Sequence, residues 1–512
     1  MIAALPLAHP LGAHQRLSQL LDGLQSRPPA AATYLEVLEA ARPALTFVQD
    51  QLAQGYLGKP LPPTTAEDAA FQAVVGLWRG LARAYSQVAR LSGAEGQEPG
   101  RLALVCQRCI HASGRVVIEH LRARREPAPG SWMELHGYFA TAEEWDLAEL
   151  PVPEPLDEAR NSQSCRAAYA AVLLLDLANP YGRPARELVW TWRWVQRWAP
   201  LLEVAPWPAR DEGSGQGVDL MADRGACPRS LLAPSASARR LDAAALAAEL
   251  RHILSQLKQN ATPAALGLGE DCPAPAAGRL LVALFRLWCL APGARRFQRR
   301  PASGEARLCY GFEAIHYHVS GTEFHQPAHV RLYSRGEMES IWTFRDQLDP
   351  TQSLALRAAQ IDYPLEAWTV ADESIGGFRL RRGSAGARVA HGQLLGIRPP
   401  GGKHFLLAQV SWHLMLAADG DLCAGVYVLP GVPVAVALRP CGVHVSPSER
   451  YGRAFLLPPM PVLNKGPSLV APRGWFQPGR VVEIYLERPI QLRLTGMLIQ
   501  GSDFERISYV RA

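Results

Sequence analysis

The segment Val370-Ala371-Asp372-Glu373-Ser374-Ile375-Gly376-Gly377-Phe378-Arg379-Leu380 indicates two short strands joined by a turn. The Asp372 carboxylate can accept two parallel hydrogen bonds from the N–H edge of a guanine, and the Ser374 hydroxyl can donate to a phosphate. Gly377 lets the backbone approach a ligand closely or adopt a positive φ. An ordinary tight β-turn uses the same residue types. The segment alone therefore fits either a ligand site or a simple turn.

A second distinctive segment, Arg295-Arg296-Phe297-Gln298-Arg299-Arg300-Pro301, lies upstream and places four arginines within six residues. It follows the end of a predicted helix at Pro292-Gly293. Its proline favours an extended or turn conformation in the residue before it. Paired guanidinium groups can bind phosphate oxygens with two parallel hydrogen bonds each. A solvated basic linker is the other interpretation of these residues.

Together the two segments resemble the PilZ family of cyclic di-GMP receptors, which carries Arg-x-x-x-Arg in a flexible lead-in and (Asp/Asn)-x-Ser-x-x-Gly on a small β-barrel. The first motif fits this sequence twice in overlap and the second fits once; the matching residues are Arg295 with Arg299, Arg296 with Arg300, and Asp372, Ser374 and Gly377. Two later segments, Ala408–Trp412 and Ala424–Val428, also look like strands of that family. The resemblance covers about residues 293–440.

The sequence departs from the family pattern in the spacing of the two motifs. Asp372 follows Arg300 by 72 residues, whereas the family's usual gap is a few tens. An insertion, for which Gly321–Ala359 is the candidate, would have to lie between the arginines and the second motif. The first barrel strand is then either Cys309–Val319 or Leu365–Val370. A second Arg-x-x-x-Arg spacing, Arg331 with Arg335, lies nearer the aspartate but is predicted to be part of a strand.

The resemblance implies a dianionic ligand that carries two guanines. Arg299 and its partner arginine would clamp a phosphate and stack on a base. Asp372 would bind a guanine, and Ser374 would hold a phosphate. Arg379 lies two residues beyond Gly377 on the same strand face and is a candidate third phosphate contact, with an ordinary surface arginine as the alternative. The arginine loop would be mobile when empty and ordered when filled, which could switch contacts with the helical part.

Apolar residues recur at three- and four-residue spacing over the first 200 residues, which predicts helices such as Tyr34–Gln54, Ala66–Leu91, Leu102–Arg124 and Arg160–Leu177. After Pro292, short strands separated by turn residues are typical of a barrel; they are Arg307–Val319, Leu365–Val370, Gly377–Arg381, Leu394–Arg398, Phe405–Trp412, Ala424–Leu429, Val434–Arg439, Arg480–Leu486 and Ile490–Leu498. We therefore predict an α+β multidomain protein. Its parts are a helical domain (bundle or short solenoid) at 1–200, a mixed joint with two helices at 201–292, a PilZ-like antiparallel β-barrel with an insertion at 293–445, and a β-rich C-terminal extension at 446–512.

Composition narrows the class of protein further. The chain of 512 residues is 48% hydrophobic and 20% charged, which excludes long disorder, collagen and coiled coil as its main architecture. No apolar run approaches the roughly 20 residues that span a bilayer, and no signal peptide is evident. Nine scattered cysteines do not suggest a disulfide framework, so we expect a reduced, cytoplasmic protein. A formal net charge of +6 is too small to indicate nucleic-acid binding by itself.

Three other groups of residues could carry chemistry. Cys106 and Cys109 with nearby His111 have half of a zinc-ribbon spacing, but a second pair is absent. A polar surface strand is the default interpretation of a histidine cluster around Glu323, formed by His316, His318, His325 and His329. Three tryptophans spaced four apart share one helix face and indicate either a packed face or a platform for stacking bases; they are Trp190, Trp194 and Trp198.

The motifs of the common enzyme families are missing, so we expect a binding protein and no enzyme, without cofactor or metal. The predicted function is a cytoplasmic bacterial receptor for cyclic di-GMP that relays its ligand state to a protein partner through the helical region. The alternative is a degenerate PilZ-like adaptor that binds no nucleotide, which the long gap before Asp372 favours. A nucleic-acid binder that uses the arginine segment and a metalloenzyme at the histidine cluster are further alternatives, and neither is expected.

Overall fold

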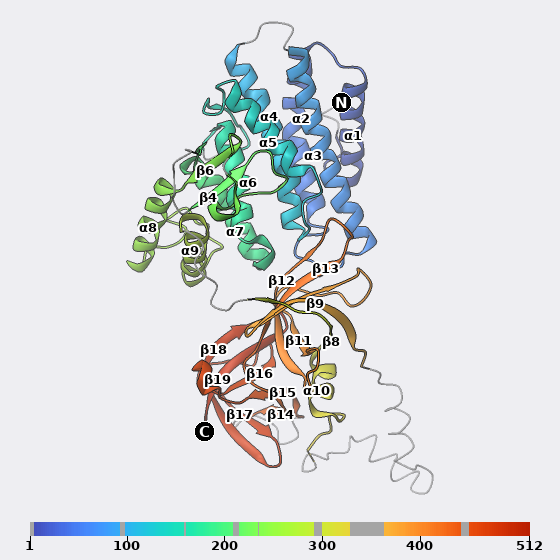
Figure 1. Cartoon of the computed structure of the whole chain (residues 1–512), viewed down its shortest axis with the longest axis vertical. Helices are drawn as coiled ribbons and strands as arrows, with labels where there is room; N and C mark the ends of the chain where they lie inside the picture. Colours follow the sequence, from blue (N-terminus) through green and yellow to red (C-terminus); the bar gives the residue numbers. More distant parts are fainter. Residues whose placement is uncertain are drawn as a thin grey trace. The chain divides into compact units, whose positions relative to one another are not determined.

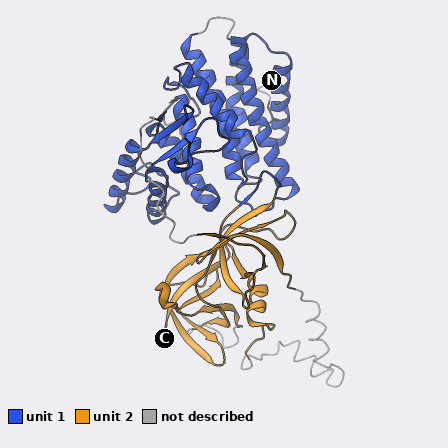
Figure 2. Ribbon diagram, viewed as in Figure 1, with its two compact units in different colours: residues 1–296, 414–420 blue, residues 297–413, 421–512 orange. Residues whose placement is uncertain are grey.

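The computed structural model describes residues 5–92, 98–157, 160–207, 215–233, 235–290, 299–327, 363–441 and 450–512. The chain divides into two compact units (Figure 2): unit 1 is residues 1–296 with 414–420, and unit 2 is residues 297–413 with 421–512. Several predicted residues lie outside the described ranges, namely Arg295, Arg296, His329, Arg331 and Arg335. Most of the predicted insertion lies there as well, because residues 328–362 are not described.

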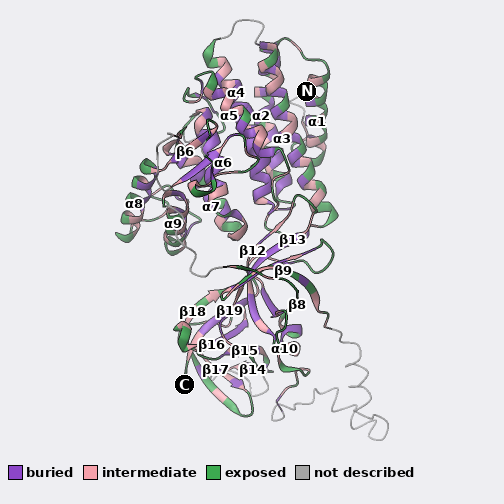
Figure 3. Ribbon diagram, viewed as in Figure 1, coloured by how far each residue is buried: buried purple, intermediate pink, exposed green. Residues whose placement is uncertain are grey.

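Unit 1 begins with five helices, of which the second to fourth are long (Figure 1): α1 Pro10–Ser26, α2 Ala31–Ala53, α3 Thr65–Ser92, α4 Pro99–Arg122 and α5 Ser131–Glu144. Their apolar stripes meet in a core that includes the fully buried side chains of Tyr34, Trp78 and Tyr85. Helix α4 is buried along most of its length (Figure 3), which is the pattern of a helix at the centre of a bundle. The prediction that the N-terminal region is helical is confirmed.

The described part of unit 1 that follows α5 combines short strands with four more α-helices, and the last two of these helices lie in the predicted joint. A two-stranded sheet, β1 Val152–Pro153 with β2 Ser162–Gln163, precedes α6 Cys165–Leu177 and α7 Ala185–Trp198. A four-stranded sheet in the order β3-β6-β4-β5 is built from β3 Glu203–Pro206, β4 Gln216–Asp219, β5 Cys227–Pro228 and β6 Ala238–Asp242. Helices α8 Ala244–Lys258 and α9 Ala274–Cys289 close the unit. They match the two helices predicted for this region.

Unit 2 starts with a six-stranded antiparallel barrel, the PilZ-like barrel that the sequence predicts. Its strands close in the order β8-β9-β10-β13-β12-β11, and a short extra strand, β7, pairs with β9. The bounds are β7 Arg300–Pro301, β8 Glu305–Tyr310, β9 Glu366–Ser374, β10 Gly377–Arg382, β11 Leu394–Arg398, β12 Leu406–Met415 and β13 Leu422–Val428. Both candidates for the first strand are therefore in the barrel, because β8 begins it and β9 lies beside β8.

The rest of unit 2 is a second closed barrel in the order β14-β15-β16-β19-β18-β17. Its strands are β14 Val434–Pro440, β15 Gly452–Leu457, β16 Ser468–Pro472, β17 Val481–Tyr485, β18 Pro489–Gln500 and β19 Phe504–Arg511. The sequence predicts this part only as a β-rich extension. Strand β14, grouped there with the first barrel, pairs with β15 and β17 in the second.

One predicted strand is wrong over most of its length. The segment 307–319 is extended only to Tyr310, where β8 ends, and it continues as the helix α10, Phe312–Ser320. Gly311, at a φ of 80°, separates the two elements, since glycine adopts this backbone conformation without steric cost. His316 and His318 consequently lie on a helix and not on one face of a strand.

Candidate functional site

Strand pairing brings the two predicted motifs together across the 72-residue gap. In the β7–β9 ladder Arg300 is paired with Glu373 and Pro301 with Asp372. Arg299 immediately precedes β7, so this pairing places it next to Asp372. The long gap does not separate the two halves of the predicted site, because the extra residues lie between β8 and β9 while β7 returns to the far end of β9.

The centre of the site is one carboxylate held between two guanidinium groups. Asp372 Oδ1 forms an ion pair with Nη1 of Arg299, and Asp372 Oδ2 lies 2.8 Å from Nε of Arg379. Arg379 is the direct cross-strand partner of Asp372 in the β9–β10 ladder, the position at which opposite charges on a sheet interact best. The exposed fraction of the side chain is 14% for the aspartate, 28% for Arg299 and 48% for Arg379. The cluster carries a net positive charge and is open to solvent.

Ser374 and Gly377 form the turn beside this cluster. They are cross-strand partners at the end of the β9–β10 hairpin, and the Ser374 hydroxyl donates to the Gly377 carbonyl oxygen at 3.3 Å. A Cβ atom on Gly377 would lie 1.9 Å from the backbone oxygen of Val426. The glycine is therefore required by the close pairing of β10 with β13, whatever else binds at the turn. Ile375 at the tip of the turn is 77% exposed.

The structure thus brings together six of the eight residues predicted for the site, and the other two, Arg295 and Arg296, lie outside the described residues. Arg300 is exposed on β7. Arg381, which neither motif includes, lies two residues further along β10, and its Nε lies 2.7 Å from Asp421 Oδ2. The alternation of side chains along a strand would have pointed to Arg381, because residues two apart, such as Arg379 and Arg381, share one face of the strand.

The competing metal sites are not supported by the geometry. Both cysteines of the CxxC segment are buried in the helical core, where burial raises the pKa of the Cys106 thiol to about 11. His316 is 6% exposed and packs its ring against Phe324 and Phe455, and burial lowers its pKa. Across the described ranges, no group of three or more histidine, cysteine or acidic side chains is arranged to hold a metal ion.

The tryptophan face of α7 is a packed face and not a base-stacking platform. All three side chains are at most 4% exposed. The Trp190 indole donates to Asp271 at 2.7 Å and the Trp194 indole to the Leu268 carbonyl at 3.0 Å. The Trp198 ring packs against Trp194 and Trp288. These contacts attach α7 to α9 and to the segment that joins α8 and α9.

No helix in the described part of the chain has both the length and the apolar character needed to cross a membrane.

Three family models match consecutive parts of the chain. Residues 1–209 match the N-terminal domain of the cyclic-di-GMP receptor FimW, residues 217–355 match its middle PilZ domain, and residues 436–512 match its C-terminal β-barrel domain. The middle match includes Arg299, Arg300 and β8 and ends before β9. The third match begins within β14, in agreement with the second barrel of the structure.

A curated relative matches nearly the whole chain. The cyclic-di-GMP receptor FimW of Pseudomonas aeruginosa is 24% identical over 528 aligned residues, which cover 95% of this chain and 85% of the relative. No solved structure matches the chain. The names of the family and of this relative describe a receptor, which is a binding protein and not a named enzyme.

Proposed function

Because the chain belongs to the FimW family of cyclic-di-GMP receptors, with a middle PilZ domain, we propose that it binds cyclic di-GMP at the Arg299–Asp372–Arg379 cluster. The observation that carries this proposal is the pairing of β7 with β9, which sets the arginine motif beside the aspartate motif. Arg295, Arg296 and Arg300 would extend the site along the loop, and Ser374 would add a hydroxyl to it.

The ion pairs of the cluster suggest how the ligand would enter. Asp372 engages a guanidinium with each oxygen, and the same two oxygens can accept the two N–H groups of a guanine edge. The guanidinium groups released from the carboxylate can bind phosphate in a bidentate manner. Binding would therefore exchange internal ion pairs for ion pairs with a dianion, so that no charge is left without a partner.

We further propose that the ligand state is relayed to a protein partner through the helical unit. Residues 414–420, which are the end of β12 and most of the turn that leads to β13, group with unit 1. In that unit the Met415 amide donates to the Arg124 carbonyl, and the Glu126 amide donates to the Met415 carbonyl, both at 2.9 Å. Since β13 also pairs with β10, the strand that carries Arg379, one hairpin connects the proposed ligand site to the helical unit along the chain. A cytoplasmic location is part of this proposal, and nine cysteines scattered along the chain suit a reducing compartment.

Calorimetric titration of the full chain with cyclic di-GMP, with GTP as a control ligand, tests the proposed site. Asp372→Ala should weaken binding by about 1–3 kcal/mol through the loss of charged hydrogen bonds, and Arg299→Ala by as much or more. Arg307→Ala is the matched control, because this exposed arginine on β8 pairs with Glu305 and not with the cluster. Absence of saturable binding by the wild-type chain at micromolar ligand would instead favour an adaptor whose barrel binds no nucleotide.

A further inference from the structure

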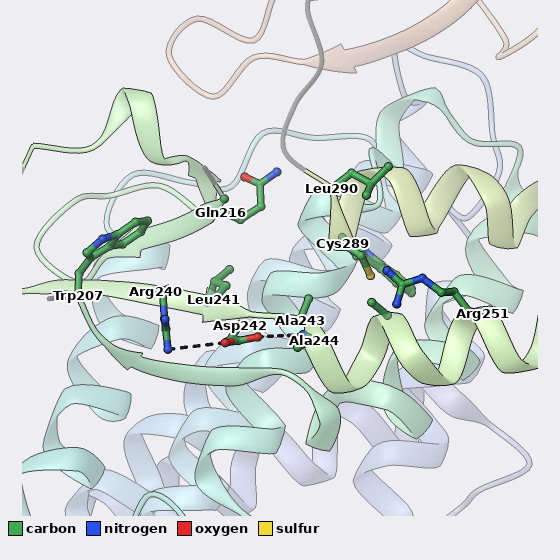
Figure 4. A pocket seen from close by; sticks show the side chains of 13 residues that line it. Trp207, Gln216, Arg240, Leu241, Asp242, Ala243, Ala244, Arg251, Cys289 and Leu290 are labelled. Carbon is green, nitrogen blue, oxygen red and sulfur yellow. Dashed lines mark hydrogen bonds and ion pairs between the residues drawn. The ribbon is translucent and has the colours of Figure 1, made fainter. Parts of the chain in front are cut away.

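Unit 1 contains a cavity of about 490 Å³ that shares no residue with the proposed receptor site (Figure 4). It lies where the strands β4 and β6 meet the start of α8 and the end of α9; the polar and aromatic side chains that line it include Trp207, Gln216, Arg240, Asp242, Arg251 and Cys289. Cavities of roughly 300–1,000 Å³ are the usual size of small-molecule sites.

The cavity wall holds buried polar atoms that lack hydrogen-bond partners. Gln216 is 8% exposed, and its Oε1 accepts no hydrogen bond within the described structure. The buried Nε of Arg240 and Nε1 of Trp207 likewise donate to no described group. Buried polar atoms in proteins are nearly always paired, so such a cluster needs an explanation. A ligand that offers an N–H group to Gln216 and an acceptor to the other two would supply the missing partners.

The charge of the cavity favours an anion. Asp242 is already engaged: its Oδ1 accepts from the Ala244 amide at 2.9 Å, and its Oδ2 lies 3.6 Å from Arg240. Arg251 has no carboxylate partner among the residues described; its guanidinium lies over the Phe285 ring at 5.2 Å. Two guanidinium groups against one carboxylate leave the cavity with a net positive charge, and guanidinium binds phosphate well.

The two ends of the cavity differ in character. Figure 4 shows Trp207 and Arg240 at one end, Arg251 beside Cys289 at the other, and Asp242 between them. We infer that this cavity binds a nucleoside monophosphate, with its base toward Trp207 and Gln216 and its phosphate at Arg251. A nucleobase supplies a flat ring with both hydrogen-bond donors and acceptors, and the phosphate supplies the negative charge. This ligand and these residues are different from those of the proposed receptor site.

Separate calorimetric titrations of the full chain with GMP, AMP, CMP and UMP test this inference. At least one nucleotide should bind the wild-type chain, and Arg251→Ala should weaken that binding by about tenfold or more. Gln216→Met removes the unpartnered oxygen at similar volume and should reduce the discrimination among the four bases. Arg286→Ala is the matched control, because this exposed arginine on the neighbouring helix α9 does not line the cavity.

The outcomes separate this site from the receptor site. Nucleotide binding that survives Asp372→Ala and is lost in Arg251→Ala supports the inference. Failure of all four nucleotides to bind the wild-type chain overturns it, and so does an equal loss of affinity in Arg251→Ala and Arg286→Ala. Arg251 is exposed on α8, so its replacement leaves the core intact. A thermal melt of Gln216→Met shows whether the buried position tolerates the change.

Discussion

The helical unit and the first barrel each contain a carboxylate bound by two arginines, in two different environments. In the helical unit, Glu154 lies between Arg42, at 2.7 Å, and Arg108, at 2.9 Å, and all three side chains are at most 5% exposed. Both arginines also pair with Glu39, which is 27% exposed. In the barrel, Asp372 lies between Arg299 and Arg379, which are 28% and 48% exposed. A buried carboxylate between two arginines cannot change partners without leaving a charge in the core, whereas an exposed one can. Burial therefore makes one cluster structural and leaves the other available for a ligand.

The strongest way to test this contrast is to remove the buried carboxylate. Glu154→Ala leaves Arg42 and Arg108 with Glu39 as their one remaining carboxylate partner among the described residues. Because two buried guanidinium groups then share a single carboxylate, we expect the free energy of unfolding to fall by about 3–5 kcal/mol. Urea unfolding followed by far-UV circular dichroism measures the change. Glu149→Ala is the control, because its carboxylate pairs with Arg166 in the same unit but is 66% exposed. Equal losses in the two variants would contradict the role assigned to burial.

A second test uses pH and the buried His120 of the same unit. Burial lowers the pKa of His120 from 6.5 to about 4, so the unfolded chain takes up a proton at a higher pH than the folded chain does. The contribution of His120 to the free energy of unfolding is therefore complete above pH 6.5. It decreases as the pH drops toward 4, by at most about 3 kcal/mol. Unfolding free energies measured across that window should fall more steeply for the wild type than for His120→Gln. If the free energies of unfolding of the wild type and of His120→Gln change in parallel with pH, then His120 does not cause the loss of stability at low pH.

The barrel cluster can be predicted from the sequence, whereas the buried cluster of the helical unit cannot, and the reason is physical. Asp372 and Arg299 belong to short motifs whose order along the chain can be recognised, although their contact depends on a β7–β9 pairing across more than 70 residues. Glu154 lies 112 residues from Arg42 in the sequence, and no local pattern marks either residue. Long-range partners of this kind are set by tertiary packing, which single-sequence periodicity does not contain.

The fold shows the same division between local and long-range information. Strands such as β11 and helices such as α3 are predicted closely, because apolar periodicity and turn residues are local signals. Segment 307–319 is assigned wrongly after Tyr310, since a short apolar run fits either a strand or a helix. Strand β14 belongs to the second barrel because it pairs with β15 and β17. The sequence pattern does not determine which strands pair with β14.

A third test compares two arginines on one strand of the barrel. Arg379 contacts Asp372 on the neighbouring strand β9. Arg381 instead contacts Asp421, which directly precedes β13, the strand on the other side of β10. If the exposed cluster binds cyclic di-GMP, Arg379→Ala should weaken binding by about 1–2 kcal/mol through a lost phosphate contact. Arg381→Ala should have a smaller effect. Calorimetric affinities of the two variants decide the point, and equal affinities would place the ligand elsewhere on the barrel.

The smallest expected effect is the most informative for the comparison. Asp372→Asn removes the central charge of the exposed cluster at constant side-chain size, yet we expect the free energy of unfolding to change by less than about 1 kcal/mol. The reason is that both guanidinium groups reach water when the carboxylate is gone, so no charge remains uncompensated in the core. Thermal and urea unfolding of the full chain should therefore leave Asp372→Asn close to the wild type while its affinity for cyclic di-GMP falls. A loss of stability as large as that of Glu154→Ala would instead mean that the barrel cluster, like the buried one, serves to hold the fold together.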